Sequence, residues 1–361
     1  MSKVKISYLQ VASLLAISTV FTYTSTLPLM ADHSTGHFIS LIISTVILLA
    51  VYTPFILSAR RESCGITAVN NSFLKYLFGG VLILRLLFTA VVTALQLEFR
   101  VTCTAMSYIS PLFFTAIVFY VALYGLQKGL QASARIAPLL IVMYVLVIVV
   151  VSVSVWGKID LLRFYSPLGV FSNNSGLLRA MSNVVKNDEL FFFAALCGFV
   201  RAKEEDGNEN KGQGFKSVLY YLPLVLVLGL WLNFLYNVVL GRLIDSTACQ
   251  MYMISSFSLF NLFERMDGIF ISVALIGGIL KIILCFLCIR IIFSHLLPVE
   301  RAAKITSSIL LAGVAVLSYF MYGNYDWLVT KYTTISLTIV MIIVAFFLPI
   351  TSFMGKNNNE N

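Results

Sequence analysis

Two polar runs interrupt otherwise apolar segments of the chain, and both are suited to binding a charged small molecule. The first runs from Thr22 to Pro28, and the second is Asn187-Asp188-Glu189, directly before the apolar run Leu190–Val200. Free backbone N–H groups at a helix start attract a carboxylate, and freed C=O groups attract an ammonium group. An amino acid carries both charges. The candidate ligand residues from these two runs are Thr22, Thr24, Ser25, Thr26, Asn187, Asp188 and Glu189.

Charged side chains inside apolar runs form a second group of candidates. Arg85 lies in the middle of GGVLILRLLFTAVV, and Lys281 lies within the run Ile269–Phe293. Because a charge at the bilayer centre costs at least about 2.5–3.5 kcal/mol, each side chain is expected to face the interior of a bundle. Arg85 serves either as a structural partner of Asp188 or Glu189 or as a contact for a ligand carboxylate. Lys281 has the same choice.

Enzyme and metal chemistry have little support in the sequence. Of the six cysteines, only Cys285 and Cys288 are close together, and they lie in an apolar run, which favours small residues on a membrane helix over a redox motif. His33 and His37 have no further metal ligand nearby. No glycine-rich phosphate loop, nucleophile elbow or zinc-ligand set occurs. We therefore expect no enzymatic activity, metal or cofactor.

Membrane helices are needed to position these candidates. Of the 361 residues, 59% are apolar and 11% are charged, against roughly 45–50% and about 25% in soluble proteins. A spanning helix needs about 20 largely apolar residues. The sequence predicts an all-α polytopic membrane protein with ten spans, at approximately 6–31, 38–57, 73–97, 109–126, 136–156, 168–200, 218–240, 269–293, 305–322 and 332–350.

The basic residues indicate how these spans are oriented. The net charge of +9 reflects Lys and Arg in loops, which marks cytoplasmic loops rather than a nucleic-acid surface. With a cytoplasmic N-terminus, fifteen Lys and Arg lie in inner segments and eight in outer segments. Both termini are therefore predicted to be cytoplasmic. We expect one transmembrane domain over residues 1–356 and a disordered tail over 357–361.

The two polar runs occupy corresponding positions in the two halves of the chain, 1–157 and 158–356. Each interrupts the first helix of a five-helix half, and discontinuous helices at such positions are typical of a 5+5 inverted-repeat transporter-like bundle with its ligand site near the midplane. Helices 1 and 6 are thus predicted to be broken. The alternative is that Thr22–Pro28 is an ordinary helix end and Asp188–Glu189 an ordinary loop.

Several segments, in this order, resemble one known family. They are KISYLQVASLLAI with a later Leu-Pro, RIAPLL, IDLLRFYSPLG, FERMDGIFISVALIGGILKI and YGNYDW. Together they resemble the spore germination permease family, the membrane B subunit of Ger-type germinant receptors, within the amino acid–polyamine–organocation superfamily. The resemblance implies ten helices, the inner membrane of the spore, and sensing of a small nutrient such as an amino acid. It also implies an A-type membrane subunit and a C-type lipoprotein subunit as partners.

The resemblance also implies where the pocket lies. The pocket of the family is built largely from helices one, three, six and eight, which adds positions around Ser272 to the candidates above. The acidic pair Glu264 and Asp267, which flanks Arg265, fits a solvated helix start. The alternative is that these three residues, together with Lys281, form a gate or a subunit contact. In related folds a cationic side chain can also replace a coupling cation, which is a third alternative for Lys281. Many relatives have glycine near the first break, whereas this chain has none from Met1 to Thr35 and has the bulky Tyr23 there.

Three functional hypotheses follow. The first is a membrane subunit of a spore germinant receptor, in which ligand binding shifts the bundle between two states. The alternative is a secondary transporter of an amino acid or amine, coupled to H⁺ or Na⁺. A third is a structural membrane scaffold without a pocket.

Overall fold

The computed structural model describes residues 6–25, 46, 53, 57, 72–102, 110–160, 189–196, 199–200, 213–240, 250–257, 267–297 and 300–324. Most of the predicted second and sixth spans and all of the tenth lie outside these ranges. So do Thr26, Asn187, Asp188, Glu264, Arg265 and the predicted tail.

Six long helices dominate the described part of the chain. They are α3 (Ser72–Arg100), α4 (Pro111–Lys128), α5 (Leu130–Ser154), α8 (Gln213–Leu235), α10 (Asp267–Leu296) and α11 (Glu300–Met321). Each of these segments is long and apolar enough to cross a membrane, with α8 continuing into a π-helical turn over Tyr236–Leu240. They confirm six of the ten predicted spans. Within the described residues the β pairing is one isolated bridge, between Ile6 and Val200.

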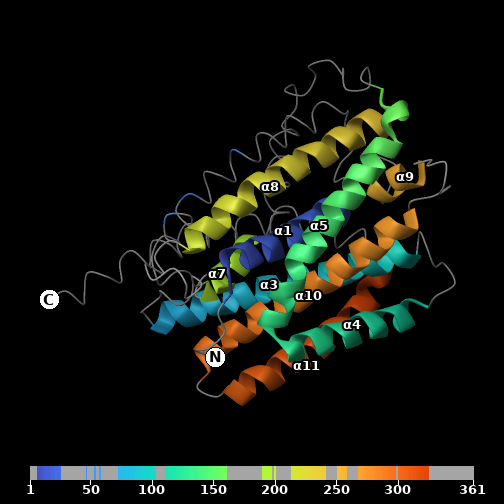
Figure 1. Cartoon of the computed structure of the whole chain (residues 1–361). Helices are drawn as coiled ribbons and strands as arrows, with labels where there is room; N and C mark the ends of the chain where they lie inside the picture. The colour runs from blue at the N-terminus through green and yellow to red at the C-terminus, as the bar shows by residue number, and fades with distance from the viewer. Residues whose placement is uncertain are drawn as a thin grey trace, which may run out of the picture.

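Helix α1 (Tyr8–Ser25) lies at the centre of the bundle. Thirteen of its 18 residues are buried, and it packs against α8, α5 and α10, with α5 crossing the bundle obliquely (Figure 1). Several of its buried residues, such as Ser18, Thr19, Thr22 and Thr24, carry hydroxyl groups. A helix of this composition is suited to an interior position, where other helices rather than lipid surround it.

Helices α3 and α10 form the next layer, and α4 and α11 lie beyond them (Figure 1). Gly79 on α3 faces Leu296 and Ile292 of α10, while Gly278 on α10 faces Leu97 of α3, so the two helices run antiparallel. The bundle is thus layered from α8 through α1 to α3 and α10, and then to α4 and α11. A charged residue on α10 or α3 can therefore face either α1 or the outer pair.

The structure describes parts of the two predicted helix breaks: the first residues of the break in the first helix are helical, and a short helix begins at Glu189. Thr22, Thr24 and Ser25 all belong to α1. The Thr22 and Thr24 hydroxyls donate to the carbonyls of Ser18 and Val20, each at 3.0 Å, so the helix itself satisfies both polar groups. The remainder of that predicted break lies outside the described part. Helix α7 (Glu189–Leu196) has eight residues, roughly 12 Å, which is too short to cross a bilayer alone.

The start of α1 and the chain after α7 lie side by side. The Ile6 N–H donates to the Phe199 carbonyl at 3.3 Å, next to the bridge between Ile6 and Val200. The first helices of the two predicted halves therefore meet at one end of the bundle, where α1 also packs against α7.

Candidate functional site

A buried lysine on α10 contacts α1. Lys281 is 3% exposed, and its Nζ donates to Thr22 Oγ1 at 2.5 Å. The Thr22 hydroxyl in turn donates to the Ser18 carbonyl one turn earlier. A residue predicted to bind ligand and a residue predicted to act in gating or subunit contact thus meet at one point in the interior.

Two glycines bring α10 close enough for this contact. A Cβ added at Gly278 would lie 2.6 Å from Leu97 Cδ2 and 2.7 Å from Phe21 Cε2, and one at Gly277 would lie 2.5 Å from the Tyr144 hydroxyl. No side chain fits at such distances without displacement of its neighbours. The Gly277-Gly278 pair therefore allows α10 to approach α1, α3 and α5, and Lys281 follows one turn later.

Two further hydroxyls lie on the same face of α1. Ser18, Thr22 and Ser25 are spaced by four and three residues, which places them above one another on a helix. Ser18 and Ser25 are buried, and neither hydroxyl has a hydrogen-bond partner among the described residues. Buried polar atoms without a partner are rare in proteins. This face of α1 is therefore able to hydrogen-bond to a solute.

Tyr23 lies on another face of α1 and does not fill this region. Its ring packs against Gly229 of α8, where an added Cβ would lie 3.0 Å from Tyr23 Cε2. The Tyr236 hydroxyl donates to the Tyr23 carbonyl at 3.4 Å. On the same side, the hydroxyls of Thr19 and Tyr221 of α8 are 3.0 Å apart. The bulk of Tyr23 is thus directed toward α8 and away from Lys281.

Arg100 binds the C-terminal end of α1 and was missed by the sequence analysis. The Arg100 side chain donates to the Thr24 carbonyl. Its guanidinium carbon lies 5.9 Å from the centre of the Phe21 ring and 5.4 Å from that of Phe270 on α10. Glu98 and Arg100 are the only charged residues between Arg85 and Lys128. The predicted third span ended at Leu97 and so assigned both to a loop, although α3 continues to Arg100.

The structure does not bring the other predicted site residues that it describes into contact with Lys281 and Thr22. Arg85 is buried on α3, with its guanidinium 6.0 Å from the centre of the Phe88 ring. Helix α3 packs against α7, which begins at Glu189, and the pairing of Arg85 with Glu189 stays a prediction. Ser272 is exposed and donates to the Gly268 carbonyl of its own helix, so it does not join Lys281 and Thr22. Asp267 is the first residue of α10.

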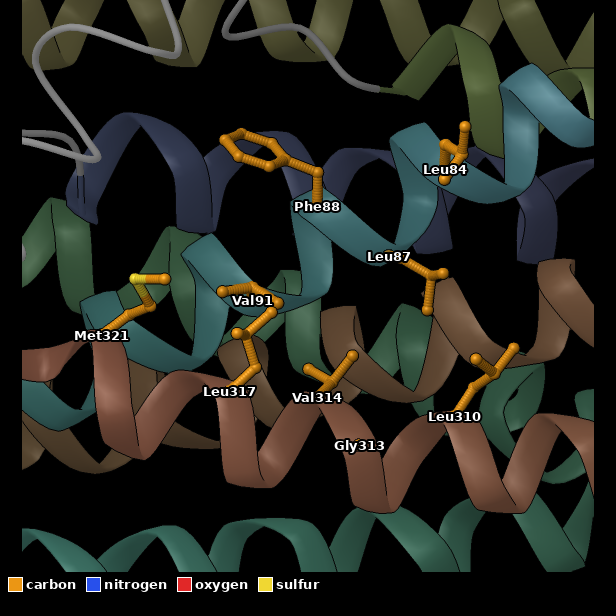
Figure 2. Close-up of a pocket in the computed structure, with 9 residues that line it drawn as sticks. All are labelled: Leu84, Leu87, Phe88, Val91, Leu310, Gly313, Val314, Leu317 and Met321. Carbon is orange, nitrogen blue, oxygen red and sulfur yellow. The ribbon is translucent and has the colours of Figure 1, made fainter.

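A groove between α3 and α11 has the wrong chemistry for a polar solute. Figure 2 shows its lining side chains, which project from these two helices. The lining residues are Leu84, Leu87, Phe88, Val91, Leu310, Gly313, Val314, Leu317 and Met321. Leu84 and Leu317 are largely exposed, so the groove opens toward the outside of the bundle. Among the described residues, no group of three His, Cys, Asp or Glu side chains is placed to hold a metal ion.

Comparisons with known proteins identify the fold. No protein-family model matches the chain, and no curated protein matches it. Among solved structures, it is similar to a substrate-bound, outward-open Na⁺-coupled sialic acid symporter, with a TM-score of 0.61, 10% identity, and coverage of 98% of this chain and 79% of that one. A closed nucleobase-cation-symport-1 family transporter with bound bromovinylhydantoin also matches, with a TM-score of 0.48, 11% identity, and coverage of 98% and 93%.

The first likeness, at low sequence identity, shows the fold. The chain is an all-α polytopic membrane protein with the inverted-repeat transporter architecture, as predicted from its broken apolar segments. Since one fold hosts several functions, function must be argued from the site.

Proposed function

We propose that the chain is a secondary transporter that binds a small amino acid or amine beside α1 and α10, with Lys281 in the role of a coupling cation. The observation that carries the proposal is the hydrogen bond between Lys281 Nζ and Thr22 Oγ1. It places a positive charge of the protein itself in the interior of the bundle. Ionisable side chains at membrane depth are expensive and mark ion or substrate pathways.

The similarity to a Na⁺-coupled symporter supports a transporter. In a Na⁺-coupled protein a bound cation stabilises one conformation of the bundle. An ammonium group attached to α10 supplies the same charge without binding from solution, and it contacts α1 through Thr22. A solute that bound more tightly to one arrangement of α1 and α10 would shift the bundle toward that arrangement.

In this transport cycle, Arg100 keeps the bundle closed at the C-terminal end of α1. Its bond to the Thr24 carbonyl and its position near the rings of Phe21 and Phe270 tie the end of α1 to α3 and α10. Opening the bundle at this end requires the charged hydrogen bond to break. The Ser18 and Ser25 hydroxyls lie on either side of Thr22 along α1 and provide donors and acceptors for a solute.

Uptake by purified protein in liposomes tests the proposal. A panel of radiolabelled L-amino acids and small amines is offered to vesicles that contain the wild-type chain, Lys281→Met or Lys304→Met. Lys304 is exposed on α11, which makes it a matched control for the loss of one positive charge. We expect saturable uptake of at least one solute by wild type and Lys304→Met, and a ten- to hundred-fold lower uptake by Lys281→Met, in keeping with a charged hydrogen bond worth about 1.5–3 kcal/mol.

A second outcome decides against transport. If no solute of the panel enters wild-type vesicles faster than protein-free vesicles, although the protein is folded and monodisperse, the transporter proposal fails. If Lys281→Met transports as well as wild type, the assigned role of Lys281 fails while transport stands.

The sequence favours a second candidate, a sensor subunit of a spore germinant receptor. Its support is the segment Phe263–Ile282, which resembles the germination permeases and contains Gly277, Gly278 and Lys281. In this role the same shift of α1 against α10 is passed to an A-type membrane subunit and a C-type lipoprotein in the inner spore membrane rather than used to move the solute.

Deletion and co-purification test this candidate. A spore-forming strain that lacks the gene should lose its germination response to one nutrient, and the affinity-tagged chain should co-purify with an A-type and a C-type subunit. Unchanged germination to every nutrient, together with purification of the chain alone, would contradict the sensor role.

A further inference from the structure

Glu98 is a buried carboxyl in the outer layers of the bundle, away from α1. It lies near the C-terminal end of α3 and is 1% exposed. Its Oε1 is 2.5 Å from the Thr115 hydroxyl of α4 and 3.2 Å from the Ser318 hydroxyl of α11. Its Oε2 is buried and has no hydrogen-bond partner among the described residues. Three helices therefore enclose one acidic group whose described hydrogen-bond partners are two hydroxyls.

The basic groups on the neighbouring elements bind elsewhere. Arg100, two residues along α3, binds the Thr24 carbonyl, and Lys281 of α10 binds Thr22. The phenol of Tyr322, after α11, is 2.7 Å from the Thr102 hydroxyl. At the opposite ends of α4 and α11, Lys128 lies over the Tyr124 ring, and Arg301 and Lys304 are exposed. No described cation therefore balances a negative charge on Glu98.

The hydroxyl pattern accommodates a neutral carboxyl. The Thr115 hydroxyl is also 2.8 Å from the Pro111 carbonyl, and the Ser318 hydroxyl is 3.0 Å from the Ala315 carbonyl. Each hydroxyl has one proton and therefore donates to only one acceptor at a time. If Thr115 donates to Pro111, its oxygen accepts a proton from a protonated Oε1. The unpartnered Oε2 is then an uncharged carbonyl oxygen, whereas in the ionised form it carries negative charge in apolar surroundings.

We propose that Glu98 is a proton-binding site of the chain, neutral while α3, α4 and α11 enclose it and ionised when their ends separate. The site lies near the ends of all three helices, since Ser318 precedes the end of α11 at Met321 and Thr115 follows the start of α4 at Pro111. A small separation there admits water to the carboxyl. In the predicted orientation this end of α3 faces the outer side of the membrane, so the exchanged proton comes from that side.

The proton site stands independently of solute transport, and its use for coupling rests on the proposed function. If the chain is a transporter, the cycle gains a proton at Glu98, apart from the contact of Lys281 with α1. If the chain is a sensor, the same group makes the response depend on external pH.

Infrared difference spectroscopy of the purified wild-type chain tests the site without any solute. We expect the C=O stretching band of a protonated carboxyl at neutral pH, where an exposed glutamate is ionised, and its loss at higher pH or in Glu98→Gln. Asp160→Asn, after α5, is the control and should leave the band unchanged. Thr115→Val keeps Glu98 but removes its hydroxyl partner, so the band should shift in frequency.

The results that would overturn the proposal are equally specific. Identical spectra of wild type and Glu98→Gln over the whole pH range would show that Glu98 stays ionised. A band that remains in Glu98→Gln, or one that Thr115→Val leaves unshifted, would place the protonated carboxyl elsewhere. If Glu98→Gln does not fold, the band of Thr115→Val decides alone.

Discussion

The bundle keeps its buried basic groups and its buried carboxyl in different layers. Lys281 and Arg100 are bonded to α1, through the Thr22 hydroxyl and the Thr24 carbonyl. Glu98 faces the hydroxyls of Thr115 and Ser318 on α4 and α11 instead. A buried ion pair between the two regions would tie them together, since breaking such a pair costs about 3–5 kcal/mol. Because the basic groups that contact α1 are not bonded to Glu98, α1 can move against α4 and α11 without breaking a bond to Glu98.

Loss of the Thr22 hydroxyl is expected to have the largest effect. Thr22→Val keeps the shape of the side chain and removes the acceptor of the Lys281 ammonium group. Because a hydrogen bond to a charged group is worth about 1.5–3 kcal/mol, we expect a ten- to hundred-fold weaker solute affinity. Equilibrium binding of the solute found in the uptake panel measures it.

Thr19→Val is the matched control for that change. Thr19 lies on the α8 side, where its hydroxyl pairs with the neutral Tyr221 phenol, so its loss should cost only about 0.5–1.5 kcal/mol of stability and leave affinity unchanged. Equal losses of affinity in both variants would mean that the Lys281 contact has no special role.

The approach of α10 to α1 can be tested at Gly278. Gly278→Ala forces Leu97 and Phe21 to move, and overpacking of this kind costs about 1–3 kcal/mol. Gly80→Ala on α3 meets nothing within 4 Å and should be neutral or stabilising by up to about 1 kcal/mol. Thermal unfolding in detergent compares the two. Equal midpoints would show that α10 does not depend on a glycine at this contact.

The role of Arg100 in closing the bundle can be tested at the C-terminal end of α1. Arg100→Gln removes a charged hydrogen bond to the Thr24 carbonyl worth about 1.5–3 kcal/mol, so opening at this end should increase at least roughly tenfold. In a background without native cysteines, Ser25→Cys reports this as faster labelling by a membrane-impermeant thiol reagent. The same labelling rate with and without Arg100 would remove Arg100 from the closure.

Substitution of Ser18 is expected to have the smallest effect, and it tests which face of α1 binds the solute. Its buried hydroxyl has no partner among the described residues, so Ser18→Ala should change the free energy of unfolding by less than about 1 kcal/mol. If the hydroxyl binds solute, affinity falls by roughly the value of one neutral hydrogen bond, about 0.5–1.5 kcal/mol. An unchanged affinity would place the solute on another face of α1.

The fold was predictable because long apolar runs in the sequence identify membrane-spanning helices directly. Runs such as 269–293 and 136–156 are long and apolar, and the structure has α10 and α5 there. The positions of the two polar runs also indicated the inverted-repeat architecture. What composition did not reveal is that hydroxyls such as those of Thr22 and Thr24 bond back to carbonyls one turn earlier, so these polar side chains are satisfied within a helix.

The site was predictable only in part. Thr22 and Lys281 were both singled out, but their contact joins residues 259 positions apart, and no local pattern encodes that distance. Glu98 and Arg100 were assigned to a loop because charges usually mark the end of a span. Their burial depends on hydroxyls of α4 and α11 and on the end of α1, which are known only once the helices are packed.

The ion requirement of uptake tests most directly whether Lys281 supplies the charge of a coupling cation. Vesicles containing the wild-type chain are loaded and diluted in buffers with Na⁺ or with choline as the only cation, at one pH. We expect equal uptake rates in the two buffers for wild type. An absolute requirement of the wild-type chain for Na⁺ would contradict this role of Lys281, because a bound Na⁺ ion would then supply the coupling charge.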